Sequence, residues 1–184
     1  MTSGSPSVAL RPTRSVTFGS GRGCPTSVIT NWAGAVARVL TDKAAELTRQ
    51  CGRTIAIAAV SARDASKDRG VDLTAAQWFV DPVKMAANAD IDVFIELIGG
   101  DEGPAREAVK AALEAGRHVV TANKARLAKH GVALAEIAEK KGVLLNYEAA
   151  VAGGIPVIKT MREALAGNSV NRVYGILNGT CNYI

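Results

Sequence analysis

The segment that most constrains the fold is the run DIDVFIELIGG at residues 90–100, which is apolar, rich in β-branched residues and closed by two glycines. A strand that is apolar on both faces is typical of a parallel sheet covered by helices on each side. Similar apolar runs occur at residues 54–61 and 118–122, and residues 104–116 carry an apolar stripe at helical spacing. This alternation of strands and helices predicts an α/β fold with a doubly wound parallel sheet.

Composition narrows the class of protein further. A chain of 184 residues has room for one domain, or for one domain and part of a second. The net charge of +5 is scattered, with no basic stripe interleaved with aromatic residues, which argues against nucleic-acid binding. The 3 cysteines fit neither a metal-ligand pattern nor a disulfide framework, and no apolar run reaches the length of a membrane span. We therefore expect a cytoplasmic protein without a membrane partner, preceded by a flexible polar leader at residues 1–14.

A glycine-rich stretch follows the first expected strand, at residues 15–18. Gly19, Gly21 and Gly23 are spaced as in a turn between a strand and a helix, where backbone N–H groups can approach a pyrophosphate. Counted from Gly19, however, the third position of the phosphate-binding pattern is Cys24, and the proline after it lacks an N–H donor. A plain glycine turn is the alternative interpretation.

The residues after the second strand bear on the choice of cofactor. A helix is expected at residues 31–50, and the strand at 54–61 follows it. An acidic residue usually binds the ribose hydroxyls of NAD at the end of that strand, but this chain has Ser61 and Arg63, with Lys67 nearby. A guanidinium suits a 2′-phosphate, so NADP is favoured over NAD if a dinucleotide binds. The alternative is that Arg63 is only a solvated loop charge.

Other polar groups are expected at the carboxyl edge of the sheet, where ligands of open α/β sheets collect. Gly99 and the glycine after it end the central strand, so a cofactor would pass over them. The strand at 118–122 delivers Asn123 and Lys124 to the same edge. A lysine there can polarise a carbonyl or hold a phosphate or carboxylate; the alternative is a helix-start lysine in water. A helix is expected to follow at residues 134–141.

The 2 histidines, His118 and His130, have no second ligand or carboxylate at a spacing that would make either catalytic. We expect both to be structural or exposed. No Ser/His/Asp or Cys/His arrangement is evident from the sequence.

The stretch GVLLNYEAAVAGGIPVIK, residues 142–159, predicts a strand at 143–147 that runs into Glu148. A loop of small residues at 149–154 and a helix opened by Pro156 are expected to follow. A carboxylate beside backbone carbonyls can hold a hard cation through oxygen ligands. An ordinary junction between strand and helix is the alternative.

Four longer stretches resemble one enzyme family. They are IDVFIELIGG, GRHVVTANKARLAKHG, NYEAAVAGGIPVIKTMREALAGN and GILNGTCNYI. Over about residues 53–184 the chain resembles homoserine dehydrogenase, which interconverts L-homoserine and L-aspartate 4-semialdehyde with a nicotinamide cofactor. The resemblance implies a Rossmann-like NAD(P)-binding domain at residues 15–150 and the beginning of an α+β substrate and dimerisation domain at residues 151–184. It also implies a cytoplasmic homo-oligomer of threonine and methionine biosynthesis.

The resemblance assigns roles to particular residues. Arg63 would lie at the 2′-phosphate, Gly99 beside the cofactor, and Lys124 near the nicotinamide and substrate. Gly179 and Thr180 would lie where cofactor and amino-acid substrate meet. A monovalent cation, usually sodium, would be held by the side chain of Glu148 and by backbone carbonyls at Val151, Gly153 and Ile155.

Two departures from the family pattern limit the expected activity. The family usually reads like GLGTVG before its first helix, but with that helix held in register those glycine positions fall on Val28, Thr30 and Ala33. The family also continues past Ile184 into the domain that carries the substrate-binding acids and the main proton-transfer lysine, so Lys124 is only a supporting group. We therefore expect the isolated chain to have negligible turnover. A non-catalytic fragment that binds a dinucleotide or pairs with other subunits is the alternative, and another dehydrogenase of an amino-acid-like substrate is less favoured.

Overall fold

A six-stranded parallel sheet forms the centre of the computed structural model, which describes residues 15–19, 29–62, 66 and 68–175. The strand order is β3-β2-β1-β4-β5-β6, and every neighbouring pair is parallel. The strands are β1 (Ser15–Gly19), β2 (Ile57–Ser61), β3 (Gln77–Phe79), β4 (Ile91–Glu96), β5 (His118–Thr121) and β6 (Leu145–Asn146). The expected doubly wound α/β fold is therefore confirmed.

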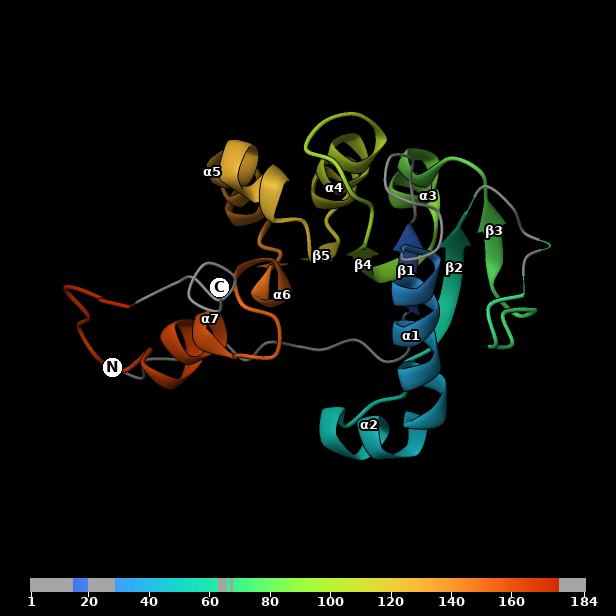
Figure 1. Cartoon of the computed structure of the whole chain (residues 1–184), viewed down its shortest axis with the longest axis horizontal. Coiled ribbons are helices and arrows are strands. Elements are labelled where there is room, and N and C mark those ends of the chain that lie inside the picture. Colours follow the sequence, from blue (N-terminus) through green and yellow to red (C-terminus); the bar gives the residue numbers. More distant parts are fainter. Residues whose placement is uncertain (1–14, 20–28, 63–65, 67, 176–184) are drawn as a thin grey trace, which may run out of the picture.

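Helices cover both faces of this sheet (Figure 1). They are α1 (Ile29–Asp42), α2 (Ala44–Cys51), α3 (Pro82–Asn88), α4 (Pro104–Glu114), α5 (Lys124–Lys141), α6 (Glu148–Val151) and α7 (Val157–Lys159), and the π-helical turn η1 (Thr160–Ala164) follows. Helices α3, α4 and α5 lie on one face, and α1 lies on the other. In the described part of the chain, no helix is long and apolar enough to cross a membrane.

Each face of the sheet has its own apolar core. Phe94 of β4 is fully buried and packs with Met85 of α3 and Val109 of α4 in the larger cluster. On the opposite face, Val60 of β2 and Ala37 of α1 belong to a smaller cluster. Successive side chains of a strand point to opposite faces, so a strand covered on both sides must be apolar throughout, which is the pattern seen in the sequence.

The helix expected at residues 31–50 is in fact two helices. Helix α1 ends at Asp42, Lys43 lies between the two, and α2 runs from Ala44 to Cys51. No residue of α2 is buried, so no core contact holds it in line with α1. Gly52 ends α2 in the left-handed conformation, with φ of 69°.

The helix expected at residues 134–141 begins ten residues earlier, at Lys124. The side chain of Asn123 caps it by accepting a hydrogen bond from the backbone N–H of Arg126 at 3.1 Å. Gly131 interrupts the apolar pattern, but the helix continues through it. The cap places Lys124 in the first turn of α5 rather than in a preceding loop.

The expected strand bounds were too wide. The strand at 90–100 is limited to Ile91–Glu96, and the strand at 143–147 to Leu145–Asn146. The expected loop at 149–154 was wrong at its start, because Glu148 opens the short helix α6, which ends at Val151. After Glu96 and before Leu145, hydrogen bonds to side chains, described below, take the place of hydrogen bonds between neighbouring strands.

Candidate functional site

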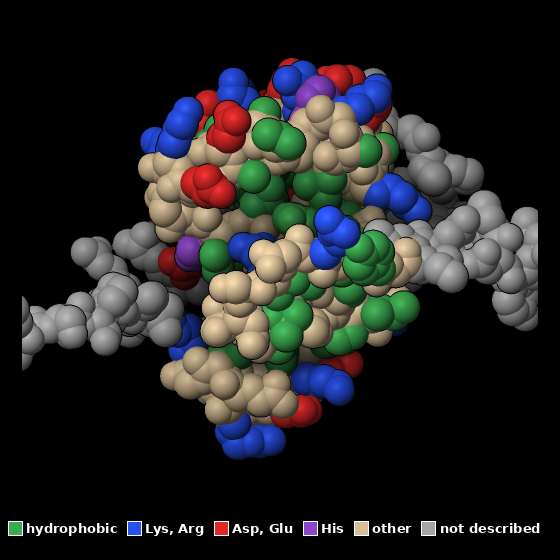
Figure 2. Space-filling view, turned by 90° about the vertical axis from the view of Figure 1, so that its left-hand side faces the viewer, with side chains coloured by type: hydrophobic (Ala, Val, Ile, Leu, Met, Phe, Trp, Pro, Cys, Tyr) green, Lys and Arg blue, Asp and Glu red, His purple; other side chains and the backbone are tan. Residues whose placement is uncertain are grey.

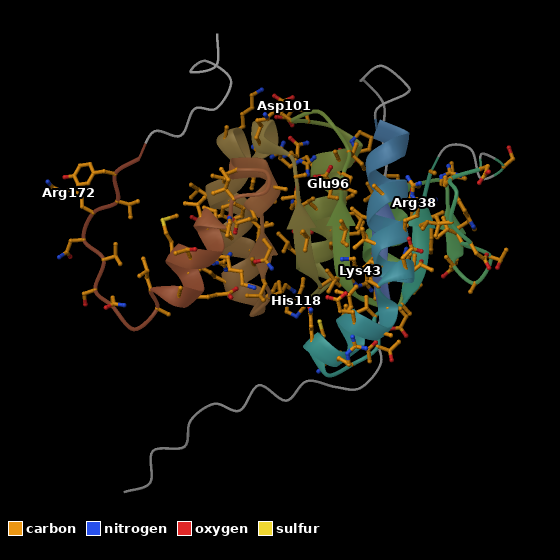
Figure 3. All side chains as sticks on the ribbon, turned by 60° about the horizontal axis from the view of Figure 1, so that its bottom comes forward. Arg38, Lys43, Glu96, Asp101, His118 and Arg172 are labelled. Atoms are coloured by element: carbon orange, nitrogen blue, oxygen red, sulfur yellow. The ribbon has the colours of Figure 1, made fainter. Side chains whose placement is uncertain are left out.

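The carboxyl ends of four strands lie in one row across the sheet. Ser61 of β2 pairs with Gly19 of β1, Gly19 with Glu96 of β4, and Glu96 with Thr121 of β5. Figure 3 shows Asp101, which follows β4, and His118, which begins β5, toward opposite ends of the strands. The row is therefore the edge at which an open α/β sheet binds its ligands.

A buried ion pair lies at this edge. Glu96 and Arg126 are 0% exposed, and Nη1 of Arg126 donates to Oε2 of Glu96 at 2.6 Å. The hydroxyl of Thr121 donates to the same oxygen at 2.5 Å, and the backbone N–H of Ile98 donates to Oε1. The carboxylate thus joins β4, β5, α5 and the loop after β4.

The side chain of Asn123 ties the loop after β4 to the start of α5. Its amide donates to the carbonyl of Ile98 at 2.9 Å and to that of Gly100 at 2.5 Å. Its carbonyl oxygen caps α5 through the N–H of Arg126. Lys124, the next residue, is exposed in the first turn of α5.

The loop between β4 and α4 is open toward solvent. Gly100 has φ of 94° and Gly103 has φ of 75°, a conformation that side chains other than glycine rarely adopt. A Cβ atom at Gly103 would meet nothing within 4 Å. Gly99, the predicted cofactor neighbour, lies in the same loop. A ligand can therefore approach this backbone closely.

Surface contacts hold the same loop against α5. Lys129 of α5 donates to the carboxylate of Asp101, which lowers the pKa of Asp101 and raises that of Lys129. Nε2 of His130 lies 2.7 Å from Oε1 of Glu102, and hydrogen bonds from His130 and Arg106 lower the pKa of Glu102. His130 thus has a structural contact with a carboxylate 28 positions away in the sequence, which agrees with the structural or exposed role expected for it.

His118 has a structural contact at the opposite edge. Its Nδ1 accepts the backbone N–H of Leu144 at 3.0 Å, which connects the start of β5 to the segment before β6. This agrees with the structural role expected for His118.

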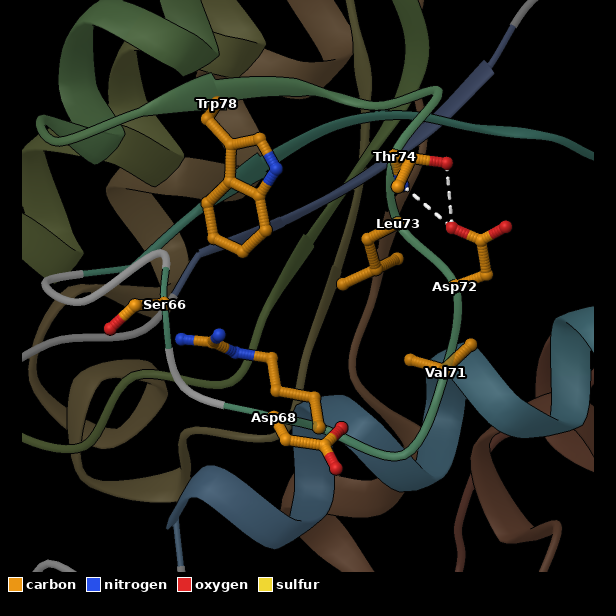
Figure 4. Close-up of a pocket in the computed structure, with 8 residues that line it drawn as sticks. Ser66, Asp68, Val71, Asp72, Leu73, Thr74 and Trp78 are labelled. Atoms are coloured by element: carbon orange, nitrogen blue, oxygen red, sulfur yellow. Dashed lines mark hydrogen bonds between the residues drawn. The ribbon is translucent and has the colours of Figure 1, made fainter.

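A hollow of about 290 Å³ lies beside β3, in the segment that connects β2 to β3 (Figure 4). The guanidinium of Arg69 lies 5.1 Å from the ring centre of Trp78 there. Asp72 accepts hydrogen bonds from the hydroxyl and the N–H of Thr74 at 2.7 and 2.9 Å, and these lower its pKa. Arg63, the predicted 2′-phosphate ligand, lies in the same connection but outside the described residues.

The carboxylate of Glu148 caps the helical segment after the glycine turn. Its two oxygens accept the backbone N–H groups of Ile158 at 2.8 Å and of Lys159 at 2.7 Å. A carboxylate has further lone pairs, so these bonds are compatible with a cation ligand. Among the described residues, no cluster of three His, Cys, Asp or Glu side chains is placed to hold a metal.

The other residues of the predicted cation site lie within the same turn. Ile155 accepts the N–H of Val157 through its carbonyl at 2.8 Å, and Gly154 turns the chain with φ of 78°. Val151 ends α6, and Gly153 follows it in the turn. Gly179 and Thr180, predicted to contact cofactor and substrate, lie outside the described residues.

The order of the strands and the carboxyl edge of the sheet together define the class of protein. A parallel sheet in the order β3-β2-β1-β4-β5-β6, with helices on both faces and an open glycine loop at its carboxyl edge, is a dinucleotide-binding domain of the Rossmann type. The chain matches the family described as "Homoserine dehydrogenase, NAD binding domain" over residues 32–148, and the family "Homoserine dehydrogenase" over residues 156–184. The chain belongs to the homoserine dehydrogenase family, whose members are NAD(P)-dependent oxidoreductases.

Individual relatives agree with this assignment. The homoserine dehydrogenase of Neisseria gonorrhoeae is 47% identical over 152 residues, which cover 82% of this chain and 34% of that protein. The enzyme of Pseudomonas aeruginosa is 46% identical over 151 residues, again 82% of this chain and 34% of that protein. The crystal structure of a homoserine dehydrogenase from Thiobacillus denitrificans superposes with a TM-score of 0.68 at 38% identity, covering 86% of this chain and 35% of that one. The chain thus spans about a third of the length of these relatives.

Proposed function

We propose that this chain is the nucleotide-binding part of an enzyme that interconverts L-homoserine and L-aspartate 4-semialdehyde, with NADP preferred over NAD. The observation that carries the proposal is the carboxyl edge, where an open glycine loop and the exposed Lys124 are held together by one hydrogen-bond network. The family match supports the substrate, and the proposed reaction would belong to threonine and methionine biosynthesis.

The described residues fit a nicotinamide dinucleotide. Helix α1 follows β1 and has no acidic residue in its first turn, so its amino end does not repel a phosphate. Gly99, Gly100 and Gly103 carry no side chains, so the backbone of the loop after β4 is open to close approach at these positions. The family match begins at residue 32, so the glycines at positions 19–23 lie before it.

Residues of this chain would have distinct tasks in the reaction. The bound cofactor supplies or accepts a hydride. Lys124 would direct its ammonium group at the carbonyl oxygen of the substrate, where a cation stabilises developing negative charge and an N–H can share a proton. Arg63 would bind the 2′-phosphate and Gly99 would allow close approach of the cofactor, while Gly179 and Thr180 would contact cofactor and substrate.

A sodium ion or other monovalent cation is proposed at the turn after β6, bound by the carboxylate of Glu148 and by the carbonyls of Val151, Gly153 and Ile155. The half-buried carboxylate and its hydrogen bond to the segment that directly follows the turn support this proposal. The role of the cation would be to hold the junction between the two proposed domains.

The domain division is proposed at about residue 150. The two family matches end and begin on either side of it, at residues 148 and 156. Beyond it the described residues bury little: α7 and η1 contain no buried residue, and Ile155, Val173 and Tyr174 are exposed. Figure 2 looks onto the side of the molecule where α5 and α7 lie in Figure 1, and shows hydrophobic side chains gathered there. An apolar surface of this kind supports a further domain or a second subunit in a cytoplasmic homo-oligomer.

Titration of NADPH and NADH fluorescence against the chain tests the proposal. We expect NADPH to bind more tightly, and Arg63→Ala to weaken NADPH by about tenfold while leaving NADH within about twofold, because only NADPH carries the 2′-phosphate. Arg49→Ala, on the exposed helix α2, is the matched control. Failure of both nucleotides to bind would favour a non-catalytic fragment that only pairs with other subunits.

A steady-state assay with aspartate 4-semialdehyde tests the activity separately. We expect negligible oxidation of NADPH by the 184-residue chain and turnover by a version extended to the length of its relatives. Turnover of another amino-acid-derived aldehyde in its place would contradict the proposed substrate.

A further inference from the structure

We propose that the buried Glu96–Arg126 ion pair is a positioning device for the cofactor edge. It would hold the loop after β4 and the start of α5, which carries Lys124, in one arrangement. The inference rests on the proposed function, because it assigns the pair to the dinucleotide site described above. Neither side chain is exposed, so both act through the backbone and side chains that they hold.

The first support is the number of segments that the Glu96 carboxylate joins. It accepts from Arg126 of α5, from Thr121 at the end of β5, and from the N–H of Ile98 in the loop. The hydroxyl of Thr121 in turn accepts the N–H of Asn123 at 3.1 Å. The carboxylate of Glu96 therefore holds the end of β5, the start of α5 and the loop after β4 relative to one another.

The second support is that two donors converge on one loop carbonyl. Nη2 of Arg126 lies 3.4 Å from the carbonyl oxygen of Gly100, and the amide of Asn123 donates to that oxygen at 2.5 Å. A guanidinium can bond a carboxylate with one nitrogen and a carbonyl with another, whereas an ammonium group has no such planar fork. Arg126 thus connects Glu96 directly to the glycine loop.

The third support is energetic. Burying two charges costs desolvation energy that their attraction roughly offsets, and apolar side chains of similar size often give equal or greater stability. Nε of Arg126 is also buried without a hydrogen-bond partner among the described residues. The pair is therefore weak evidence for added stability, and we assign it instead to fixing the arrangement of the loop.

The test compares variants of the full chain by amide hydrogen exchange and by nucleotide titration. The double variant Glu96→Gln/Arg126→Met removes both charges and keeps the side-chain volumes similar. Arg126→Lys keeps the charge and removes the fork. Arg49→Met makes the same substitution on the exposed helix α2 and serves as the control.

We expect the double variant to melt near the temperature of the wild type. Its Ile98 amide should exchange about tenfold faster, since its charged acceptor is lost, and its Kd for NADPH should rise about tenfold. Arg126→Lys should fall between the double variant and the wild type, and Arg49→Met should stay within about twofold of the wild type in both measurements.

Native exchange and native Kd in the double variant would overturn the inference. Failure of the double variant to fold would also overturn it, because the pair would then serve folding itself. If the wild type binds neither NADPH nor NADH, the proposed function fails for this chain, but the exchange rate of Ile98 still decides whether the pair positions the loop.

Discussion

Removal of the Glu148 carboxylate tests what holds the turn after β6 to the segment that follows. The carboxylate accepts two backbone N–H groups, at 2.7 and 2.8 Å, at the start of α7. Helix α7 and the turn η1 contain no buried residue, so few apolar contacts hold them. Arg162 adds a hydrogen bond to the carbonyl of Leu145 at 3.0 Å. The capping bonds are thus a large part of what keeps this segment in place.

The expected cost follows from the geometry of the cap. A hydrogen bond to a charged acceptor contributes about 1.5–3 kcal/mol, and loss of a helix cap costs about 0.5–2 kcal/mol. Glu148 is only half-buried, which places the expected loss for Glu148→Ala at about 1–2 kcal/mol of local stability. That loss raises the open population of the segment roughly 5–30-fold.

Limited proteolysis with trypsin measures that population, because Lys159 and Arg162 lie within the segment. Cleavage follows the open fraction when opening and closing are fast. We expect cleavage there to accelerate roughly 5–30-fold in Glu148→Ala, with cleavage after Arg49 unchanged. Replacing choline chloride by sodium chloride at constant ionic strength should slow cleavage of the wild type only, if the cation binds at Glu148.

Unchanged cleavage at Lys159 and Arg162 would refute the reasoning about the cap. Equal protection of wild type and Glu148→Ala by sodium would refute the proposed cation site while leaving the cap intact. Glu148→Gln separates the contributions, since it retains one acceptor oxygen but loses the charge that a cation requires.

Two further predictions concern the cofactor-edge loop and helix α3. Lys129 lowers the pKa of Asp101, so the stability that Asp101 contributes is present above its unfolded pKa and is lost as the pH falls through its lower folded pKa. The pKa of Lys129 is raised, so the stability that Lys129 contributes is lost as the pH rises through its higher folded pKa. Protection of the loop amides should therefore exceed that of Asp101→Asn between about pH 5 and pH 10, where both side chains are charged, and the difference should disappear only well below about pH 4 and well above about pH 10; equal protection throughout would contradict the ion pair. The side chain of Asp81 accepts the N–H groups of Val83 and Lys84 at 2.8 and 3.3 Å, so Asp81→Ala should lower the free energy of unfolding by about 1 kcal/mol and the melting temperature by roughly 2–4 °C. Asp81→Asn keeps the acceptor and should retain most of that stability in the same thermal melt.

The sheet was predictable because each central strand carries its own signal. An apolar run on both faces requires helices above and below it, and the alternation of runs and stripes then leaves few topologies. Strand ends were less predictable. Residues 97–100 continue the apolar pattern of β4, yet they leave the ladder because Asn123 and Glu96 take the hydrogen bonds of Ile98.

The start of helix α5 is set by a capping side chain rather than by the apolar pattern of the sequence. Its first half has a polar outer face and contains Gly131, so apolar periodicity indicated only residues 134–141. Asn123 is a favoured cap residue, and its side chain fixes the first turn at Lys124. A search for caps upstream of the apolar stripe would have placed Lys124 on the helix from the sequence alone.

The Glu96–Arg126 pair had no such local signal. A glutamate inside an apolar run indicates either an exposed strand end or a buried partner, and the partner is 30 residues away in the next crossover. The strand order narrows the search for a partner of Glu96. Strand β4 pairs with β5, and α5 follows β5 directly. A cation in the first turn of α5 must therefore lie near the end of β4. Glu96 and Arg126 meet that condition once the cap at Asn123 sets the helix start. A doubly wound sheet together with the cap narrows the partners of Glu96 to the cations in the first turn of α5, Lys124 and Arg126, and the structure shows that Arg126 is the partner.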